Sequence, residues 1–121
     1  MSKRILAIED QEDNRRILRD LLTAKGFALL EAVTGEAGLA AAERERPDLI
    51  LMDIQLPGMD GYEVTRRIKA NPELRHIPII VVTSYALSGD DQKAAAAGCD
   101  GYVTKPFSPR ALLAKIQEFL Q

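Results

Sequence analysis

The chain has 121 residues, a formal net charge of −2 and 46% hydrophobic residues, which fits one globular domain with its own core. The slight acidity argues against a nucleic-acid-binding protein, which normally carries a basic stripe. No apolar run approaches the roughly 18 residues of a membrane span, and the run at residues 5–8 is shorter than the about 7–15 residues of a signal-peptide core. With neither pattern found, we expect a cytoplasmic protein. The single cysteine, Cys99, cannot form an internal disulfide, which fits a reducing compartment.

Short apolar runs alternate along the chain with longer stretches whose apolar residues recur at helical spacing. The runs predict five strands, at residues 5–8, 27–33, 49–52, 79–82 and 102–104. A helix is expected after each strand, and the first carries its apolar residues at Ile17, Leu18, Leu21 and Leu22. This alternation predicts an α/β fold, a parallel sheet with helices on both faces. Strands that are almost wholly aliphatic are expected to be buried on both sides.

Capping residues, glycine and proline mark the helix boundaries. The expected starts are Thr34, Asp60 with Glu63 as a capping box, Ser88, and Ser108 followed by a first-turn proline at Pro109. The expected ends lie at Gly26, before Pro47, near Asn71-Pro72 and at Gly98. We read the only histidine, His76, as a surface residue, and Cys99 as a small packing residue beside Gly98.

Polar side chains stand where four of the predicted strands end. Glu9 and Asp10 follow the first strand, Asp53 the third, Thr83 the fourth and Lys105 the fifth. In a parallel sheet these ends meet at one edge, where ligands of such folds bind. Three carboxylates, a hydroxyl and an ammonium group would then face each other. This cluster suits a divalent cation and a phosphoryl group.

Five groups of residues resemble, in order and spacing, the receiver domains of two-component response regulators. They are Glu9-Asp10, Met52-Asp53, residues 56–61, Val82-Thr83-Ser84 and Lys105-Pro106-Phe107. The resemblance covers residues 1–121 as one receiver domain. Met1 favours a free-standing protein, and a domain excised from a larger regulator or hybrid kinase is the alternative. It implies a flavodoxin-like, doubly wound sheet with strand order 2-1-3-4-5. Residues 9–14 and 52–57 are most similar to single-domain cell-division regulators and to the receivers of hybrid kinases.

The resemblance also implies the roles of the clustered residues. Asp53 is the expected phosphoacceptor, and a carboxylate that is ionised at neutral pH needs no general base. Glu9, Asp10, Asp53 and the backbone carbonyl of Gln55 are the expected ligands of Mg²⁺. Glu9 stands where aspartate is commoner, which adds one methylene of reach. Lys105 is expected to neutralise Asp53 before reaction and to hold a phosphoryl oxygen afterwards.

A switch is implied by the same resemblance. Thr83 is expected to move towards the phosphoryl group, and Tyr102 to turn inward as Thr83 shifts. A cis peptide bond is expected at Lys105-Pro106. The helix after Thr83 carries four alanines, residues 94–97, which we expect to anchor it weakly because they bury little apolar area.

The implied function is a signalling module of a phosphorelay that turns over no metabolite. Its phosphodonor would be a sensor histidine kinase or a histidine phosphotransfer protein. Its output would be a downstream protein that binds the fourth helix, fifth strand and fifth helix. We expect neither nucleic acid nor membrane as a partner, and a monomer or weak dimer.

Three other functions are compatible with the predicted fold. A receiver-like module could bind partners without phosphorylation, although the intact cluster argues against this. A flavodoxin-like cofactor carrier would need backbone donors for a phosphate after the first strand, where Glu9 and Asp10 would repel it. An aspartyl phosphatase would carry a second acid two residues after its nucleophile, where this chain has Gln55.

Overall fold

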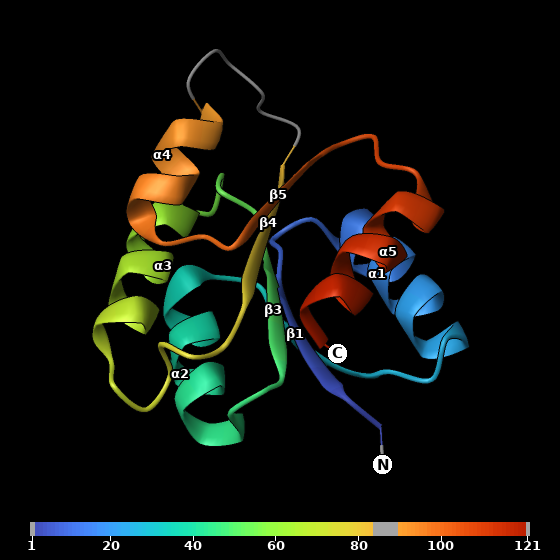
Figure 1. Ribbon diagram of the computed structural model, residues 1–121, viewed down its shortest axis with the longest axis horizontal. Helices are drawn as coiled ribbons and strands as arrows, with labels where there is room; N and C mark the ends of the chain where they lie inside the picture. The colour runs from blue at the N-terminus through green and yellow to red at the C-terminus, as the bar shows by residue number, and fades with distance from the viewer. Residues whose placement is uncertain (1, 84–89, 121) are drawn as a thin grey trace.

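The computed structural model describes residues 2–83 and 90–120, in which helices and strands alternate (Figure 1). The strands are β1 (Arg4–Ile8), β2 (Ala28–Ala32), β3 (Leu49–Met52), β4 (Ile79–Thr83) and β5 (Gly101–Thr104). The helices are α1 (Glu12–Ala24), α2 (Gly35–Glu45), α3 (Gly61–Ala70), α4 (Asp90–Ala97) and α5 (Pro109–Leu120). All strand pairs are parallel and the order is β2-β1-β3-β4-β5, so the predicted fold is confirmed.

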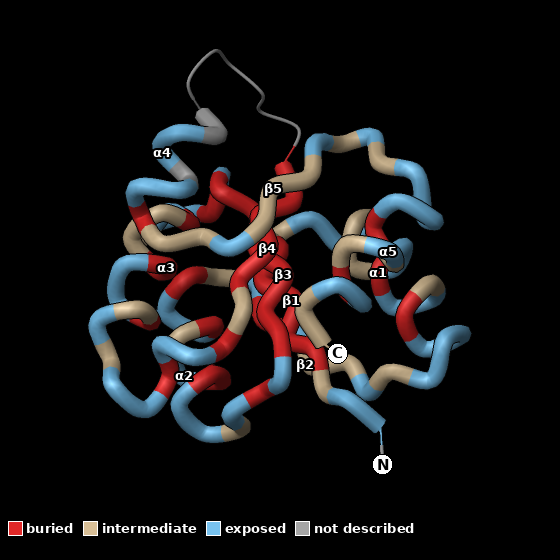
Figure 2. The backbone as a smooth tube through the Cα atoms, in the orientation of Figure 1, coloured by how far each residue is buried: buried red, intermediate tan, exposed pale blue. Residues whose placement is uncertain are grey.

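Helices cover both faces of the sheet, with α1 and α5 on one side and α2, α3 and α4 on the other (Figure 1). Side chains alternate along each strand, so β1 sends Ile5 and Ala7 towards α1 and α5, and Leu6 and Ile8 towards α2 and α3. Each described residue of β3 and β4 is buried, as Figure 2 shows along the centre of the molecule. Burial on both faces is why these runs are aliphatic without alternation.

The strand register sets the geometry of the site. Ile8 of β1 lies opposite Met52 of β3, so the next residues, Glu9 and Asp53, leave neighbouring strands at the same level. The amide of Asp53 donates to the carbonyl of Ile8 at 3.0 Å, which extends the pairing by one step. The chain therefore delivers both acidic residues to one edge of the sheet.

Side-chain caps hold three of the predicted helix starts, but the capping box expected at Asp60 and Glu63 forms only its Asp60 half. Thr34 Oγ1 accepts a hydrogen bond from the amide of Ala37 at 3.0 Å, Asp60 Oδ1 from Glu63 at 2.9 Å, and Ser108 Oγ from Ala111 at 3.4 Å. The carboxylate of Glu63 is directed along α3 to Arg66 and Arg67. The predicted cap at Ser88 lies outside the described residues.

The structure corrects the bounds of the second strand and shows which apolar residues of α1 and α4 are exposed. The second strand is shorter than residues 27–33, because Phe27 and Val33 flank β2 at the edge of the sheet. In α1, Ile17 is 52% exposed, since Leu18 and Leu22 occupy the buried stripe. Along α4, the alanines at 95 and 96 are exposed and Ala97 is buried. None of the helices in the described ranges has the length and apolarity to cross a bilayer.

Candidate functional site

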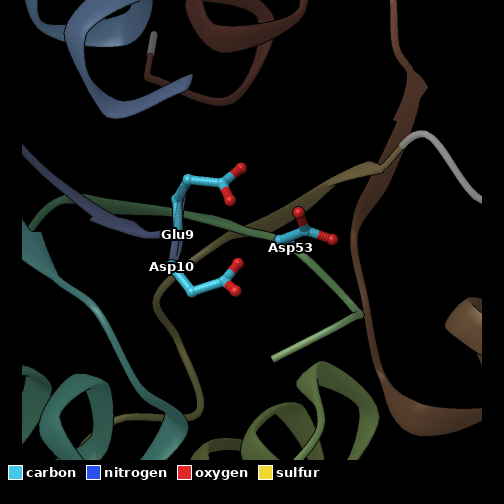
Figure 3. A group of neighbouring side chains, drawn as sticks. All are labelled: Glu9, Asp10 and Asp53. Atoms are coloured by element: carbon cyan, nitrogen blue, oxygen red, sulfur yellow. The ribbon is translucent and has the colours of Figure 1, made fainter. Parts of the chain in front are cut away.

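Three carboxylates converge beyond the ends of β1 and β3. Glu9 and Asp10 begin the loop between β1 and α1, and Asp53 follows β3 (Figure 3). One carboxylate oxygen from each residue lies within 4.8 Å of those of the other two. Glu9 is only 3% exposed and Asp53 8%. The acidic residues selected from the sequence are therefore gathered at one site.

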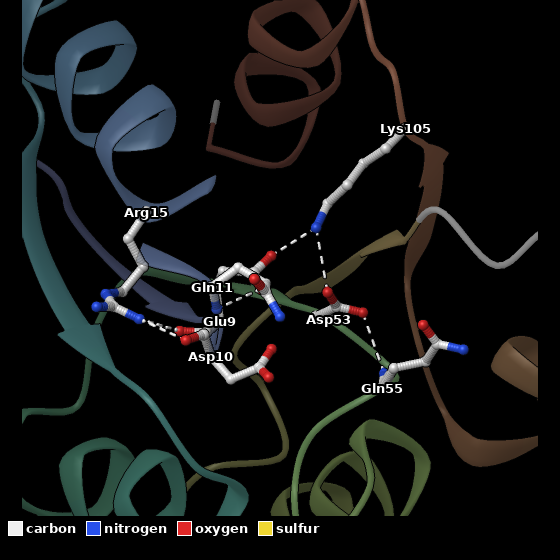
Figure 4. Close-up of polar contacts among 7 residues, drawn as sticks. All are labelled: Glu9, Asp10, Gln11, Arg15, Asp53, Gln55 and Lys105. Atoms are coloured by element: carbon white, nitrogen blue, oxygen red, sulfur yellow. Dashed lines mark hydrogen bonds and ion pairs between the residues drawn. The ribbon is translucent and has the colours of Figure 1, made fainter. Parts of the chain in front are cut away.

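Lys105 closes this cluster from the loop between β5 and α5. Its Nζ atom donates to Glu9 Oε1 at 2.5 Å and to Asp53 Oδ2 at 3.1 Å (Figure 4). The peptide bond from Lys105 to Pro106 is cis. One ammonium group offsets one of the three carboxylate charges, so the site keeps an excess of negative charge that favours a cation.

Glu9 and Lys105 each shift the pKa of the other. Burial raises the pKa of Glu9, and the negative charge of Asp53 adds to this, while the hydrogen bond from Lys105 opposes it. Burial works to lower the pKa of Lys105, but the hydrogen bond to Glu9 and the charge of Asp53 outweigh it and leave that pKa raised. The ammonium is thus held in its charged form between two carboxylates.

Backbone amides orient the same two carboxylates. The N–H of Gln11 donates to Glu9 Oε2 at 3.1 Å, and the N–H of Gln55 donates to Asp53 Oδ1 at 3.0 Å. Glu9 and Asp53 each have one oxygen on Lys105 and the other on an amide two residues ahead (Figure 4). Both side chains are therefore fixed in direction. The backbone carbonyl of Gln55 stays a predicted metal ligand.

The two switch candidates lie beside the cluster on the next strands. Thr83, fully buried at the end of β4, accepts the backbone N–H of Lys105 on its carbonyl oxygen at 2.8 Å. Tyr102 of β5 lies opposite Val81 and is half-buried against Val81 and Ile54. The backbone therefore connects Thr83 directly to the residue that contacts Asp53.

The donor set fits Mg²⁺. This ion takes oxygen ligands at about 2.0–2.1 Å, so two ligands of one ion lie at most about 4.2 Å apart. The three carboxylate groups, within 4.8 Å of one another, would need only a slight inward movement. Their hard oxygens, excess negative charge and position at the edge of the sheet suit a small divalent cation.

Two features beside the cluster were not predicted from the sequence. Arg15 of α1 donates to the backbone carbonyls of Glu9 and Asp10, whereas in the sequence it is one of several charged residues on a helix. A groove of about 400 Å³ also lies beside Lys105. Its lining residues are Asn14, Ile17, Lys105, Pro106, Phe107 and Pro109.

Comparison with known proteins agrees with the motifs. The family model described as response regulator receiver domain matches residues 5–117. The chain belongs to this family. This receiver domain is 42% identical over 120 residues to the polar-differentiation response regulator DivK of Brucella anthropi, covering 99% of this chain and 98% of DivK. The family predicted from the residues is thus confirmed.

Solved receiver structures share the fold along nearly the whole chain. A CheY-like receiver domain protein from Methanospirillum hungatei is 35% identical with a TM-score of 0.92, covering 99% of this chain and 94% of that one. The receiver domain of a sensor histidine kinase from Pseudomonas aeruginosa is 36% identical with a TM-score of 0.92, covering 99% and 98%. That structure has a magnesium ion coordinated in its active-site cleft.

Proposed function

We propose that this receiver domain is a phosphorylation-controlled signalling module in which Asp53 accepts a phosphoryl group from a histidine of a partner protein. The proposal depends on the convergence of Lys105 with three carboxylates. The Nζ atom of Lys105 lies 3.1 Å from Asp53 Oδ2, and one oxygen of each carboxylate lies within 4.8 Å of those of the other two. Burying an aspartate beside two other acids is unfavourable, so a residue with only a structural role at the surface would not be expected in this position.

Asp53 acts as the nucleophile. One carboxylate oxygen forms a bond to phosphorus, while the phosphorus–nitrogen bond to the donor imidazole breaks and its electron pair goes to that nitrogen. The main barrier is electrostatic, because one anion approaches another. Lys105 offsets part of this charge from its position between Asp53 and Glu9.

The acidic residues hold the cation that the reaction needs. Glu9, Asp10, Asp53 and the backbone carbonyl of Gln55 would hold Mg²⁺, whose positive charge would offset the negative charge of the phosphoryl group. The amide donors to Glu9 and Asp53 keep both carboxylates aimed before the cation arrives. The magnesium named in the Pseudomonas aeruginosa receiver structure supports this choice of ion.

The groove beside Lys105 favours a protein as phosphodonor. Its lining is largely apolar, and it includes the exposed Ile17 and half-buried Phe107. Apolar side chains of a partner would bury there with the donor histidine next to the cluster. We infer a histidine kinase or histidine phosphotransfer protein as the donor.

The output step uses Thr83, Tyr102 and α4. After transfer, the hydroxyl of Thr83 would bind a phosphoryl oxygen, and Tyr102 would follow as the end of β4 shifts. Helix α4 can move at low cost, because two of its alanines are exposed and bury little surface. A downstream protein would then recognise the changed surface of α4, β5 and α5.

Intact mass spectrometry after incubation with a small-molecule phosphodonor tests this function. We expect one added phosphoryl group with Mg²⁺, none with a chelator and none in Asp53→Asn. Asp60→Asn is the matched control, because asparagine caps a helix as well as aspartate does, and it should accept the group normally. Acid quenching at short times prevents rapid hydrolysis from hiding the adduct. An adduct that persists in Asp53→Asn, or none at all when Mg²⁺ is bound, would overturn the proposal.

A further inference from the structure

We propose that Arg15 is a positioning residue, which fixes the backbone of the loop that carries Glu9 and Asp10 and thereby sets the affinity of the site for a divalent cation. The inference rests on the proposed function only in taking Mg²⁺ as that cation. Arg15 lies on the first turns of α1, and it approaches the loop from the side opposite Lys105 (Figure 4).

One nitrogen of Arg15 holds two consecutive carbonyl groups. Its Nη1 atom donates to the backbone oxygen of Glu9 at 2.9 Å and to that of Asp10 at 3.0 Å. Hydrogen bonds from a charged donor are stronger than neutral ones, and this side chain is only 15% exposed. Glu9 and Asp10, which supply two of the three carboxylates of the acidic cluster, are therefore tied by their main chain to α1.

Arg15 is itself oriented by the edge strand β2. Its Nε atom lies 3.5 Å from Glu31 Oε1, and the same carboxylate accepts two hydrogen bonds from Arg19, at 2.9 and 2.8 Å. The two arginines thus share one acid, but the contacts to the carbonyls of Glu9 and Asp10 come from Arg15. This makes Arg19 a matched control within the same ion-pair group.

A positioning role and a purely electrostatic role predict opposite signs. Arg15 carries a positive charge next to a site for a cation, so removing that charge alone would strengthen the binding of Mg²⁺. Releasing the loop has the reverse effect, because Glu9 and Asp10 must then be ordered each time the cation binds. A weaker affinity after the loss of Arg15 therefore identifies positioning.

The test is a calorimetric titration of Mg²⁺ into the whole chain, without any phosphodonor. In Arg15→Met, which keeps the apolar stem and removes the donors, we expect affinity to fall about 10-fold, the lower end of what outer-sphere changes at metal sites cause. Arg19→Met should bind as wild type does. Arg15→Lys, which can still donate to one carbonyl, should fall between wild type and Arg15→Met.

A second measurement separates loop release from general unfolding. In Arg15→Met, the amide proton of Gln11, which donates to Glu9 Oε2, should exchange faster with solvent, while amides of β3 and β4 keep their protection. Circular dichroism checks that each variant is folded at the titration temperature. If Arg15→Met does not fold, Arg15→Gln takes its place under the same criterion.

The outcomes distinguish this inference from the proposed function. Binding of Mg²⁺ to Arg15→Met that equals or exceeds wild type would overturn the positioning role, and so would equal weakening in Arg19→Met. Failure of the wild-type chain to bind Mg²⁺ would instead remove the metal from the proposed function. Weaker binding confined to the Arg15 variants, with faster exchange at Gln11, would support the inference.

Discussion

Two lysines lie at opposite edges of the sheet, and their surroundings differ in charge balance. At the edge formed by the carboxyl ends of the strands, called the carboxyl edge below, Lys105 faces Glu9 and Asp53 with Asp10 nearby. At the amino edge, the Nζ atom of Lys69 contacts Asp100 at 2.9 Å and the carbonyls of Arg75 and Ile77 at 3.1 and 2.9 Å.

The two side chains have similar exposure, 13% for Lys105 and 20% for Lys69. Within residues 2–83 and 92–120, the acid paired with Lys69 is Asp100, which also accepts the amide of Ile79 at 2.8 Å. There the charge of Lys69 is balanced by one carboxylate, and its Nζ atom has three hydrogen-bond acceptors. Lys105 lies among more negative charge than it can offset. Burial of a charged group alone therefore does not mark a site; an excess of one sign does.

Replacing each lysine by methionine tests most directly whether charge balance distinguishes the two edges. Lys105→Met leaves three neighbouring carboxylates without their cation, and we expect a loss of about 3 kcal/mol in unfolding free energy in the presence of a chelator. Because the remaining site is more negative, Mg²⁺ should restore more stability to this variant than it adds to wild type. Urea unfolding with and without Mg²⁺ measures both effects.

Lys69→Met should cost less and respond differently. Asp100 is 36% exposed, so water can solvate it after the change, and we expect a loss of about 1–3 kcal/mol. The increment from Mg²⁺ should equal that of wild type. Two outcomes would show that charge balance does not distinguish the two edges. One is a gain in unfolding free energy from Mg²⁺ that is larger in Lys69→Met than in wild type, and the other is a gain in Lys105→Met no larger than in wild type.

Alanine substitutions at two glycines, one near each edge, compare the two edges in a second way. A Cβ atom at Gly61 would lie 2.4 Å from the carbonyl oxygen of Asp53 and 2.8 Å from the Cα atom of Ile54, and backbone there cannot give way easily. Gly61→Ala should therefore destabilise the fold by about 1–3 kcal/mol and displace Asp53. At a limiting concentration of phosphodonor, intact mass spectrometry should show slower phosphorylation of this variant than of wild type.

Gly98→Ala is the counterpart at the amino edge. Gly98 has a φ of +107° and its added Cβ would meet Lys69 Cγ at 2.9 Å, which is a side chain that can shift. We expect a loss of about 1–2 kcal/mol from the backbone conformation. Once Gly98→Ala is folded, its phosphorylation rate should match wild type. A rate as low as that of Gly61→Ala would contradict a local effect at Asp53.

The sequence determines some parts of this structure more strongly than others. The strands β1, β3 and β4 were predictable because burial on both faces leaves them continuously aliphatic. Glu9 and Asp53 were predictable as neighbours because each follows such a strand directly. The edge strand β2 was less well bounded, since Phe27 and Val33 are apolar but lie outside it.

Contacts from side chains to backbone could not be predicted from residue patterns. The role of Arg15 depends on two carbonyl groups that face it after α1 folds back. The role of Lys69 depends likewise on the carbonyls of Arg75 and Ile77. In sequence, both are ordinary charged residues of amphipathic helices. The exposure of Ile17 was also unpredictable, because helical spacing alone does not say which apolar residues face the sheet.

The smallest expected effect concerns two glutamates with opposite charge balance. Burial raises the pKa of Glu9, so between its unfolded and folded pKa values the folded protein binds more proton. The contribution of Glu9 to unfolding free energy therefore falls as pH rises through that interval. The hydrogen bond from Arg19 lowers the pKa of Glu31. Its contribution is present above the unfolded pKa and is lost as pH falls through the folded one.

Urea unfolding of wild type, Glu9→Gln and Glu31→Gln between acid and neutral pH, with a chelator present, measures these slopes. The difference between wild type and Glu9→Gln should decrease as pH rises, whereas the difference for Glu31→Gln should increase. The second slope should be shallow, because Glu31 is partly exposed and solvent screens its pairs. Slopes of the same sign would mean that Lys105 balances the buried cluster as fully as two arginines balance Glu31. The carboxyl edge would then carry no excess charge to attract a cation.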